Sequence, residues 1–284
     1  MKRFVVAISV LVLGLASIAV GQQNRPFTIE ELLKVRRVAD PRVSPDGKSV
    51  AFTIGDVNFD GNRVVNQIYI VSLAGGEMEQ LTSGDKSASS PRWAPDGKKI
   101  AYVTGSQIWV MDHNGNAKEQ VTRISTGTGG PVWLPDGGWI AFTSEVYPEC
   151  KDDDCNKRKD EAADQSKVKA HITERLLFRH WDEWRDAKRA HVFVVPVKGG
   201  AARDLTPGDF DSPPYAAASG IDYAFSPDGK EMAFLRNPDK VEAVSTNSDI
   251  YVVSLSGGAA KNITIRNKGY DVGPVYTRYG KSIL

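Results

Sequence analysis

The sequence predicts an all-β fold, an incomplete β-propeller of four-stranded blades preceded by a short N-terminal helix. Three observations support this. A Pro-Asp-Gly turn recurs along the chain, a segment rich in β-branched and aromatic residues follows each turn, and each unit closes with a short segment ending in threonine. Four short antiparallel strands in units of about 40 to 50 residues are typical of propeller blades.

The composition fits an ordinary globular protein and excludes one class of function. The chain has 284 residues and a formal net charge of +1. It therefore lacks the strongly basic surface with which nucleic-acid-binding and anionic-membrane-binding proteins hold phosphate groups. We expect no nucleic acid as a partner, and no membrane once the N-terminal segment has been removed.

The first 21 residues are predicted to form a signal peptide. Lys2 and Arg3 precede an apolar run, residues 4–20, that contains no charge. The small residues Ala19 and Gly21 suit a signal peptidase, so we expect cleavage before the next residue. An uncleaved anchor is the alternative, because the run is close to the shortest that spans a bilayer. The sequence thus predicts an exported protein, periplasmic or extracellular.

Residues 22–41 are predicted to be a lead-in with one short helix. Thr28 and Glu31 have the spacing of a capping box, in which each side chain hydrogen-bonds the backbone N–H of the other residue. A short apolar stripe follows. We expect the helix to end at Asp40-Pro41, because the residue before a proline avoids the helical region.

Four copies of a strand–turn–strand pattern organise the remainder, residues 42–284. In each copy proline presets φ for the turn, aspartate bonds its own backbone, and glycine supplies the positive φ that the turn requires. The copies are Ser44–Phe52, Ala94–Tyr102, Leu134–Phe142 and Ser226–Phe234. Bulky side chains in these units are expected to fill the space between blades, namely Trp93, Tyr102, Trp109, Trp133 and Phe142.

Two further strands complete each unit. Their composition predicts third strands at Gln67–Ser72, Gln107–Asp112, His191–Pro196 and Asp249–Ser254. Short fourth strands follow at Glu79–Thr82, Glu119–Thr122, Arg203–Thr206 and Lys261–Thr264. Residues 273–284 repeat the first hairpin with Arg278-Tyr279-Gly280 in place of Pro-Asp-Gly. We therefore expect four blades and the start of a fifth. Because a propeller that ends there leaves its ring unclosed, we expect the chain to be part of a longer protein.

The third unit carries an insertion, residues 145–190, between its second and third strands. Acidic and basic residues are equally numerous in its charged part, residues 149–189. Residues 149–169 are predicted to form a solvated helical or irregular excursion. Residues 172–184 are predicted to form a strand that pairs with His191–Val195. Since successive connections alternate between the two ends of a sheet, the insertion should lie on the face opposite the Pro-Asp-Gly turns.

The two cysteines, Cys150 and Cys155, are candidates for a disulfide within the insertion. They enclose a lysine and three aspartates. In an oxidising compartment a disulfide is favoured. The alternative, a metal site of thiolates and aspartates, matches no common coordination set. We expect no metal site and no cofactor.

These repeats resemble the TolB/WD40-like propeller modules shared by the periplasmic TolB proteins and the prolyl oligopeptidase family of serine peptidases. The segments Thr28–Gly47, His171–Trp184 and Lys188–Val195 are similar to bacterial dipeptidyl-peptidases and acylaminoacyl-peptidases of that family. The resemblance implies a C-terminal α/β-hydrolase domain carrying the catalytic Ser, Asp and His. No Gly-x-Ser-x-Gly sequence occurs here, so we assign no catalytic residue to these 284 residues.

The functional hypothesis concerns Arg179, His180, Asp182 and Glu183 in the insertion. The carboxylates suit the N-terminal amine of a peptide substrate, and Arg179 suits a carbonyl or carboxylate group. The alternative is a surface hairpin with cross-strand ion pairs and stacked tryptophans. The resemblance implies a propeller that admits peptide substrates beside the hydrolase domain of an exported serine peptidase. The competing hypothesis is a non-enzymatic, TolB-like periplasmic propeller that binds a protein partner.

Overall fold

A computed structural model describes residues 26–174, 176, 178–180, 182–185, 187–214 and 222–284. The predicted signal peptide, residues 1–21, lies outside these described residues. The chain divides into two compact units, residues 1–36 and residues 37–284. Within the described ranges no helix is long and apolar enough to cross a membrane.

The first unit contains one described helix, α2 (Ile29–Leu33), and its predicted capping box is confirmed. The Thr28 hydroxyl accepts the Glu31 N–H at 3.2 Å, and the Glu31 carboxylate accepts the Thr28 N–H at 3.3 Å. The expected helix end at Asp40-Pro41 is wrong. Both residues lie in strand β1 (Arg37–Val43), at a break in its ladder that leaves Asp40 with a φ of +49°. The proline therefore marks a β-bulge and not a helix end.

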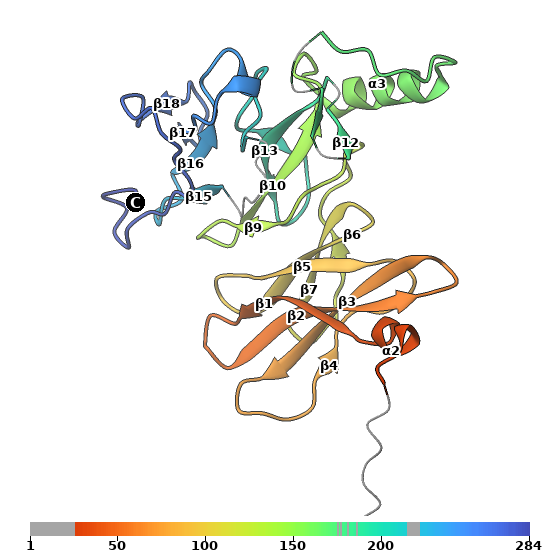
Figure 1. Cartoon of the computed structure of the whole chain (residues 1–284). Helices are drawn as coiled ribbons and strands as arrows, with labels where there is room; N and C mark the ends of the chain where they lie inside the picture. The colour runs from red at the N-terminus through yellow and green to blue at the C-terminus, as the bar shows by residue number, and fades with distance from the viewer. Residues whose placement is uncertain (1–25, 175, 177, 181, 186, 215–221) are drawn as a thin grey trace, which may run out of the picture. The chain divides into compact units, whose positions relative to one another are not determined.

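The second unit is built of four antiparallel sheets with four strands each, which confirms the predicted blades (Figure 1). Within every sheet the strands pair in chain order, so each blade is a meander. Blade one is β1, β2 (Ser49–Asn58), β3 (Arg63–Ser72) and β4 (Glu79–Gln80), and blade two is β5 (Ala88–Trp93), β6 (Lys99–Thr104), β7 (Gln107–Asp112) and β8 (Glu119–Gln120). Blade three is β9 (Val132–Trp133), β10 (Trp139–Val146), β13 (Arg189–Pro196) and β14 (Arg203–Asp204), and blade four is β15 (Tyr223–Phe225), β16 (Glu231–Arg236), β17 (Asp249–Ser254) and β18 (Lys261–Asn262).

The Pro-Asp-Gly turns share one geometry. In blade one the Gly47 N–H donates to the Ser44 carbonyl at 2.9 Å, and the Ser44 N–H donates to the Ser49 carbonyl at 2.8 Å. The other three turns repeat both bonds, and all four glycines have φ between +67° and +71°, where a side chain would be strained. The segment 273–284 forms the same turn, with Gly280 at φ +66°.

Apolar side chains pack between consecutive blades and form the core. Ile68 and Leu81 of blade one pack with Tyr102 of blade two, and further clusters join blades two with three and three with four. The side chain of Phe142 is completely buried. Trp93 and Trp133 add polar links, because each indole N–H donates to a backbone carbonyl of the preceding blade at 2.9 Å. The predicted interblade role of the aromatic residues is thus confirmed.

The insertion contains helix α3 (Asp153–Gln165) and a separate two-stranded sheet of β11 (Arg179–His180) and β12 (Glu183–Trp184). The helix confirms the expected excursion. The predicted pairing of residues 172–184 with His191–Val195 is wrong, because β13 already pairs with β10 on one side and β14 on the other. With no edge free, β11 and β12 pair with each other. A short 3₁₀ helix, η1 (Glu242–Val244), precedes β17.

Candidate functional site

The insertion on blade three forms the candidate site. It leaves β10 after Val146 and returns to β13 at Arg189, two residues that pair directly. The Pro-Asp-Gly turn of the same blade joins β9 to the opposite end of β10. The insertion therefore emerges at the end of the blade away from that turn, as the order of the connections predicts.

The predicted substrate-binding residues meet in the β11–β12 hairpin. Arg179 pairs with Trp184, His180 pairs with Glu183, and Asp182 lies in the connection between the strands. The side chains of Arg179 and Asp182 are exposed, while those of His180 and Glu183 lie outside the described atoms. The hairpin thus presents charge to solvent at the blade end.

An aromatic cluster lies beside these charges. Trp184 is 51% exposed, and the His171 ring stacks on it with centroids 4.3 Å apart. The Phe178 ring lies 6.2 Å from the same indole and is also exposed. Exposed aromatic faces of this kind suit contact with an apolar group or a cation of a ligand.

Helix α3 is tied to the blade at its N-terminal end. The Asp152 carboxylate caps the helix by accepting the Cys155 N–H at 2.8 Å, and a disulfide joins Cys150 to Cys155. Buried Asn156 accepts the Tyr147 N–H at 2.8 Å and donates to the Asp152 carbonyl at 3.1 Å. These contacts fix the helix to the chain that leaves β10.

Tyr147 connects the two ends of the insertion. The ammonium groups of Lys159 and Lys188 lie 4.6 and 5.2 Å from the centre of its ring. Asp160 accepts hydrogen bonds from the Tyr147 hydroxyl at 3.2 Å and from Lys188 at 2.9 Å. Cation–π and ionic contacts therefore connect the helix to the residues that lead into β13.

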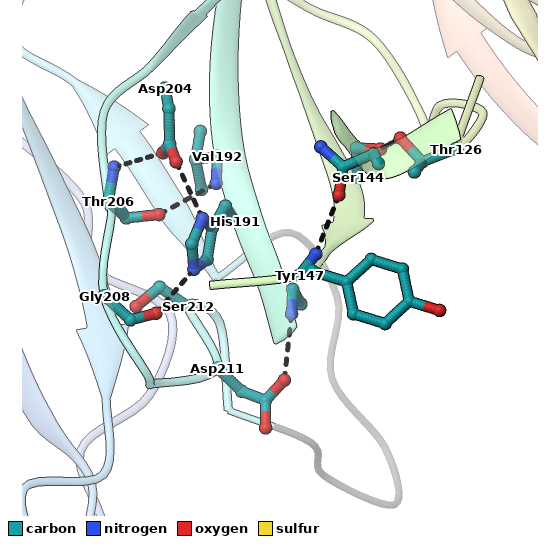
Figure 2. A network of polar contacts seen from close by, with 12 residues as sticks. Thr126, Ser144, Tyr147, His191, Val192, Asp204, Thr206, Gly208, Asp211 and Ser212 are labelled. Carbon is teal, nitrogen blue, oxygen red and sulfur yellow. Dashed lines mark hydrogen bonds and ion pairs between the residues drawn. The ribbon is translucent and has the colours of Figure 1, made fainter. Parts of the chain in front are cut away.

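A buried histidine, His191, lies near the start of β13 and takes part in a network of polar contacts (Figure 2). His191 is 1% exposed, and its Nδ1 and Nε2 atoms lie 2.7 Å from an Asp204 carboxylate oxygen and 2.8 Å from the Gly208 carbonyl oxygen. A carbonyl only accepts hydrogen bonds, so Nε2 carries a proton. The imidazole thereby holds the loop after β14 against the third strand.

A cluster of charges that the sequence did not reveal surrounds this loop. Arg185 forms an ion pair with buried Asp211, whose second oxygen accepts the Ala190 N–H at 2.9 Å. Arg189 donates to Asp209 at 3.0 Å. Burial, reinforced by the negative charge of Asp211, raises the pKa of Glu242 above its usual value.

Arg236 is a further residue, outside that cluster, that the sequence analysis did not single out. Its guanidinium lies 4.6 Å from the centre of the Phe210 ring and donates through Nε to the Ser212 hydroxyl at 3.2 Å. Burial lowers the pKa of this guanidinium. Alignment of the four turns could have revealed Arg236, because it is charged while the residues at the same position in the other copies are uncharged, namely Ile54, Thr104 and Ser144.

In the part of the chain that the structure describes, no group of three or more His, Cys, Asp or Glu side chains is arranged to hold a metal ion. The arrangement instead offers exposed charge, exposed aromatic rings and a rigid support. Such a surface can bind and orient a ligand.

Comparison with known proteins identifies the relatives of this chain. Dipeptidyl-peptidase 5 of Porphyromonas endodontalis is 33% identical over 271 residues, which are 91% of this chain and 38% of that protein. The chain thus spans little more than a third of the length of this curated relative.

Two solved structures share the fold. Acylaminoacyl peptidase of Pyrococcus horikoshii matches 82% of this chain and 33% of its own, with a TM-score of 0.59 and 18% identity. TolB from Acinetobacter baumannii matches 87% of this chain and 48% of its own, with a TM-score of 0.50 and 18% identity. The model of the TolB beta propeller domain matches residues 32–221, which are well over half of the chain and include all of its first three blades. On this match and on its four-stranded blades, the chain belongs to the TolB β-propeller domain family.

Proposed function

We propose that this chain is the propeller of an exported serine peptidase of the prolyl oligopeptidase family. In this role it filters peptide substrates and holds their N-terminal ends. The similarity to dipeptidyl-peptidase 5, whose name denotes removal of dipeptides, supports the proposal. The observation that carries it is the charged hairpin β11–β12, presented by the insertion at one end of blade three.

The residue-level proposal assigns amine binding to the hairpin. Asp182 and Glu183 hold the substrate's N-terminal ammonium, and Arg179 holds a carbonyl or carboxylate group, with His180 beside them on β11. Exposed Trp184 lowers the local access of water to such a contact.

Steady-state kinetics on the complete protein test the proposal. Asp182→Ala and Glu183→Ala should each raise KM for a dipeptidyl substrate with a free amine by roughly 10- to 100-fold, because each removes a charge-assisted hydrogen bond to that amine. The same peptide with an acetylated amine should show little change. Asp164→Ala, which removes an exposed carboxylate from α3, is the matched control.

Two results would contradict the proposal at different levels. Equal effects on the free and acetylated peptides would remove the hairpin from amine recognition while leaving the peptidase assignment intact. Absence of any peptide hydrolysis by the complete protein would remove the peptidase assignment itself and favour a non-enzymatic binding module.

A further inference from the structure

A polar side chain, buried or partly buried, recurs at one equivalent position of the third strand in every blade. In blade one the Gln67 amide donates to the Gly84 carbonyl at 2.9 Å, and in blade two the Gln107 amide donates to the Ile124 carbonyl at 2.8 Å. His191 makes the equivalent contact in blade three. Blade four has Asp249 there, and an ionised carboxylate has no proton to donate.

Around Asp249, which stands in blade four where the other blades have Gln or His, several buried oxygen atoms lack hydrogen-bond partners among the described residues. Asp249 is 1% exposed, and one of its oxygens accepts the Asn262 amide at 2.5 Å. The other oxygen has no hydrogen bond to any residue that the structure describes. The same is true of the Asn247 amide oxygen and of one carboxylate oxygen of Asp271. A buried, unpaired carboxylate oxygen is costly, so this cluster indicates a positively charged ligand.

The strand register brings these three side chains together. Ser248 and Tyr270 form a parallel bridge, and the Asp271 N–H donates to the Ser248 carbonyl at 3.0 Å. Side chains alternate between the two faces along extended backbone. The residues next to the bridge pair therefore share the face opposite to that of Ser248 and Tyr270, and these residues are Asn247, Asp249 and Asp271. The second oxygen of Asp271 accepts the Asn267 amide at 2.6 Å, which fixes that carboxylate.

We propose that Asp249, Asp271 and Asn247 bind a calcium ion. The three donors are all oxygens, which hard cations prefer, and two carboxylates balance one divalent charge. Water and backbone carbonyls complete a coordination shell of the flexible kind that calcium accepts. The ion joins β17 to residues 270–271 and so fastens the segment that leads from blade four into the hairpin at residues 275–284.

Calorimetric titration of the purified, metal-depleted protein with calcium chloride tests the proposal. We expect one site with a Kd of about 0.1 to 1 mM, the range of extracellular calcium modules. Asp249→Asn and Asp271→Asn should each weaken binding at least about tenfold, because each removes a charged ligand. Asp164→Asn, on exposed α3, should leave the Kd unchanged. Absence of binding, or an unchanged Kd in both site variants, overturns the proposal.

Thermal unfolding gives a second, independent measurement. In EDTA, Asp249→Asn should unfold at a higher temperature than the wild-type protein, because it removes an unpaired buried charge. Calcium should raise the unfolding temperature of the wild type and not that of the variant. A lower unfolding temperature for the variant in EDTA would mean that protein groups or water already satisfy the carboxylate. A response to magnesium as large as that to calcium would overturn the choice of ion.

Discussion

Replacing Thr122 by valine should destabilise the protein by about 1 to 3 kcal/mol, although the two side chains have nearly the same shape. The threonine that ends each blade accepts a backbone N–H from fourteen residues earlier, at 2.8 to 2.9 Å in all four blades. In blade two this donor is Ile108, and the Thr122 hydroxyl also donates to the Gln107 amide oxygen at 2.9 Å. One hydroxyl thus connects the third strand to the end of the fourth.

The magnitude follows from which groups the substitution leaves unpaired. Valine fills the same volume, so no cavity forms and little apolar area changes. The Ile108 N–H loses its acceptor beside a side chain that is 2% exposed, and a buried donor without a partner costs about 1 to 3 kcal/mol. The Gln107 amide oxygen adds little, because it still accepts the Ile124 N–H at 3.1 Å.

Urea unfolding followed by tryptophan fluorescence measures this free energy. Thr206→Val should give a similar loss, since its hydroxyl accepts the buried Val192 N–H at 2.9 Å. Thr246→Val is the control, because this threonine is exposed; its effect should stay within about 0.5 kcal/mol. If Thr122→Val were as mild as the control, the recurring threonine would not be what holds the third strand to the fourth.

Two further predictions concern burial. Phe142→Ala should lower the free energy of unfolding by about 3 to 5 kcal/mol, because the fully buried ring stacks on Phe193. The same change at exposed Phe59 should have little effect. Burial raises the pKa of Glu242, so its contribution to stability declines as pH rises from the unfolded pKa through the folded pKa. Glu242→Gln should therefore raise the free energy of unfolding at pH 7 and change it little in acid below both pKa values, and an equal gain at both would contradict this assignment.

The blades could be predicted because their determinants are local. Proline, aspartate and glycine specify the turn within four residues, wherever the rest of the chain lies. The hairpin at residues 273–284 illustrates this, since Gly280 alone retains the turn after Arg278 and Tyr279 replace proline and aspartate. Capping at Thr28 is equally local, and the sequence predicted it correctly.

Strand partners and charge clusters could not be predicted in this way. β-Propensity marks residues 172–184 as extended but does not say which strand has a free edge, and β13 has none. Glu242 begins the single-turn 3₁₀ helix η1, which has no sequence periodicity, and only the fold places it near Asp211. The register of β11 with β12 likewise depends on a pairing that spacing alone does not fix.

The junction of blades three and four differs from the earlier junctions at the ends of the strands, while its apolar core follows the same pattern. Phe225 occupies the position from which Trp93 and Trp133 donate to the preceding blade, and a phenyl ring has no N–H to make that bond. A cavity of about 520 Å³ opens there between Trp139 and Lys230, near the turns. The apolar cluster between the same blades is nevertheless continuous. Stability thus comes from the apolar core that the two blades share, so the ends of the blades can vary in sequence and structure. At the end of blade three away from the turns, this variation takes the form of the charged insertion.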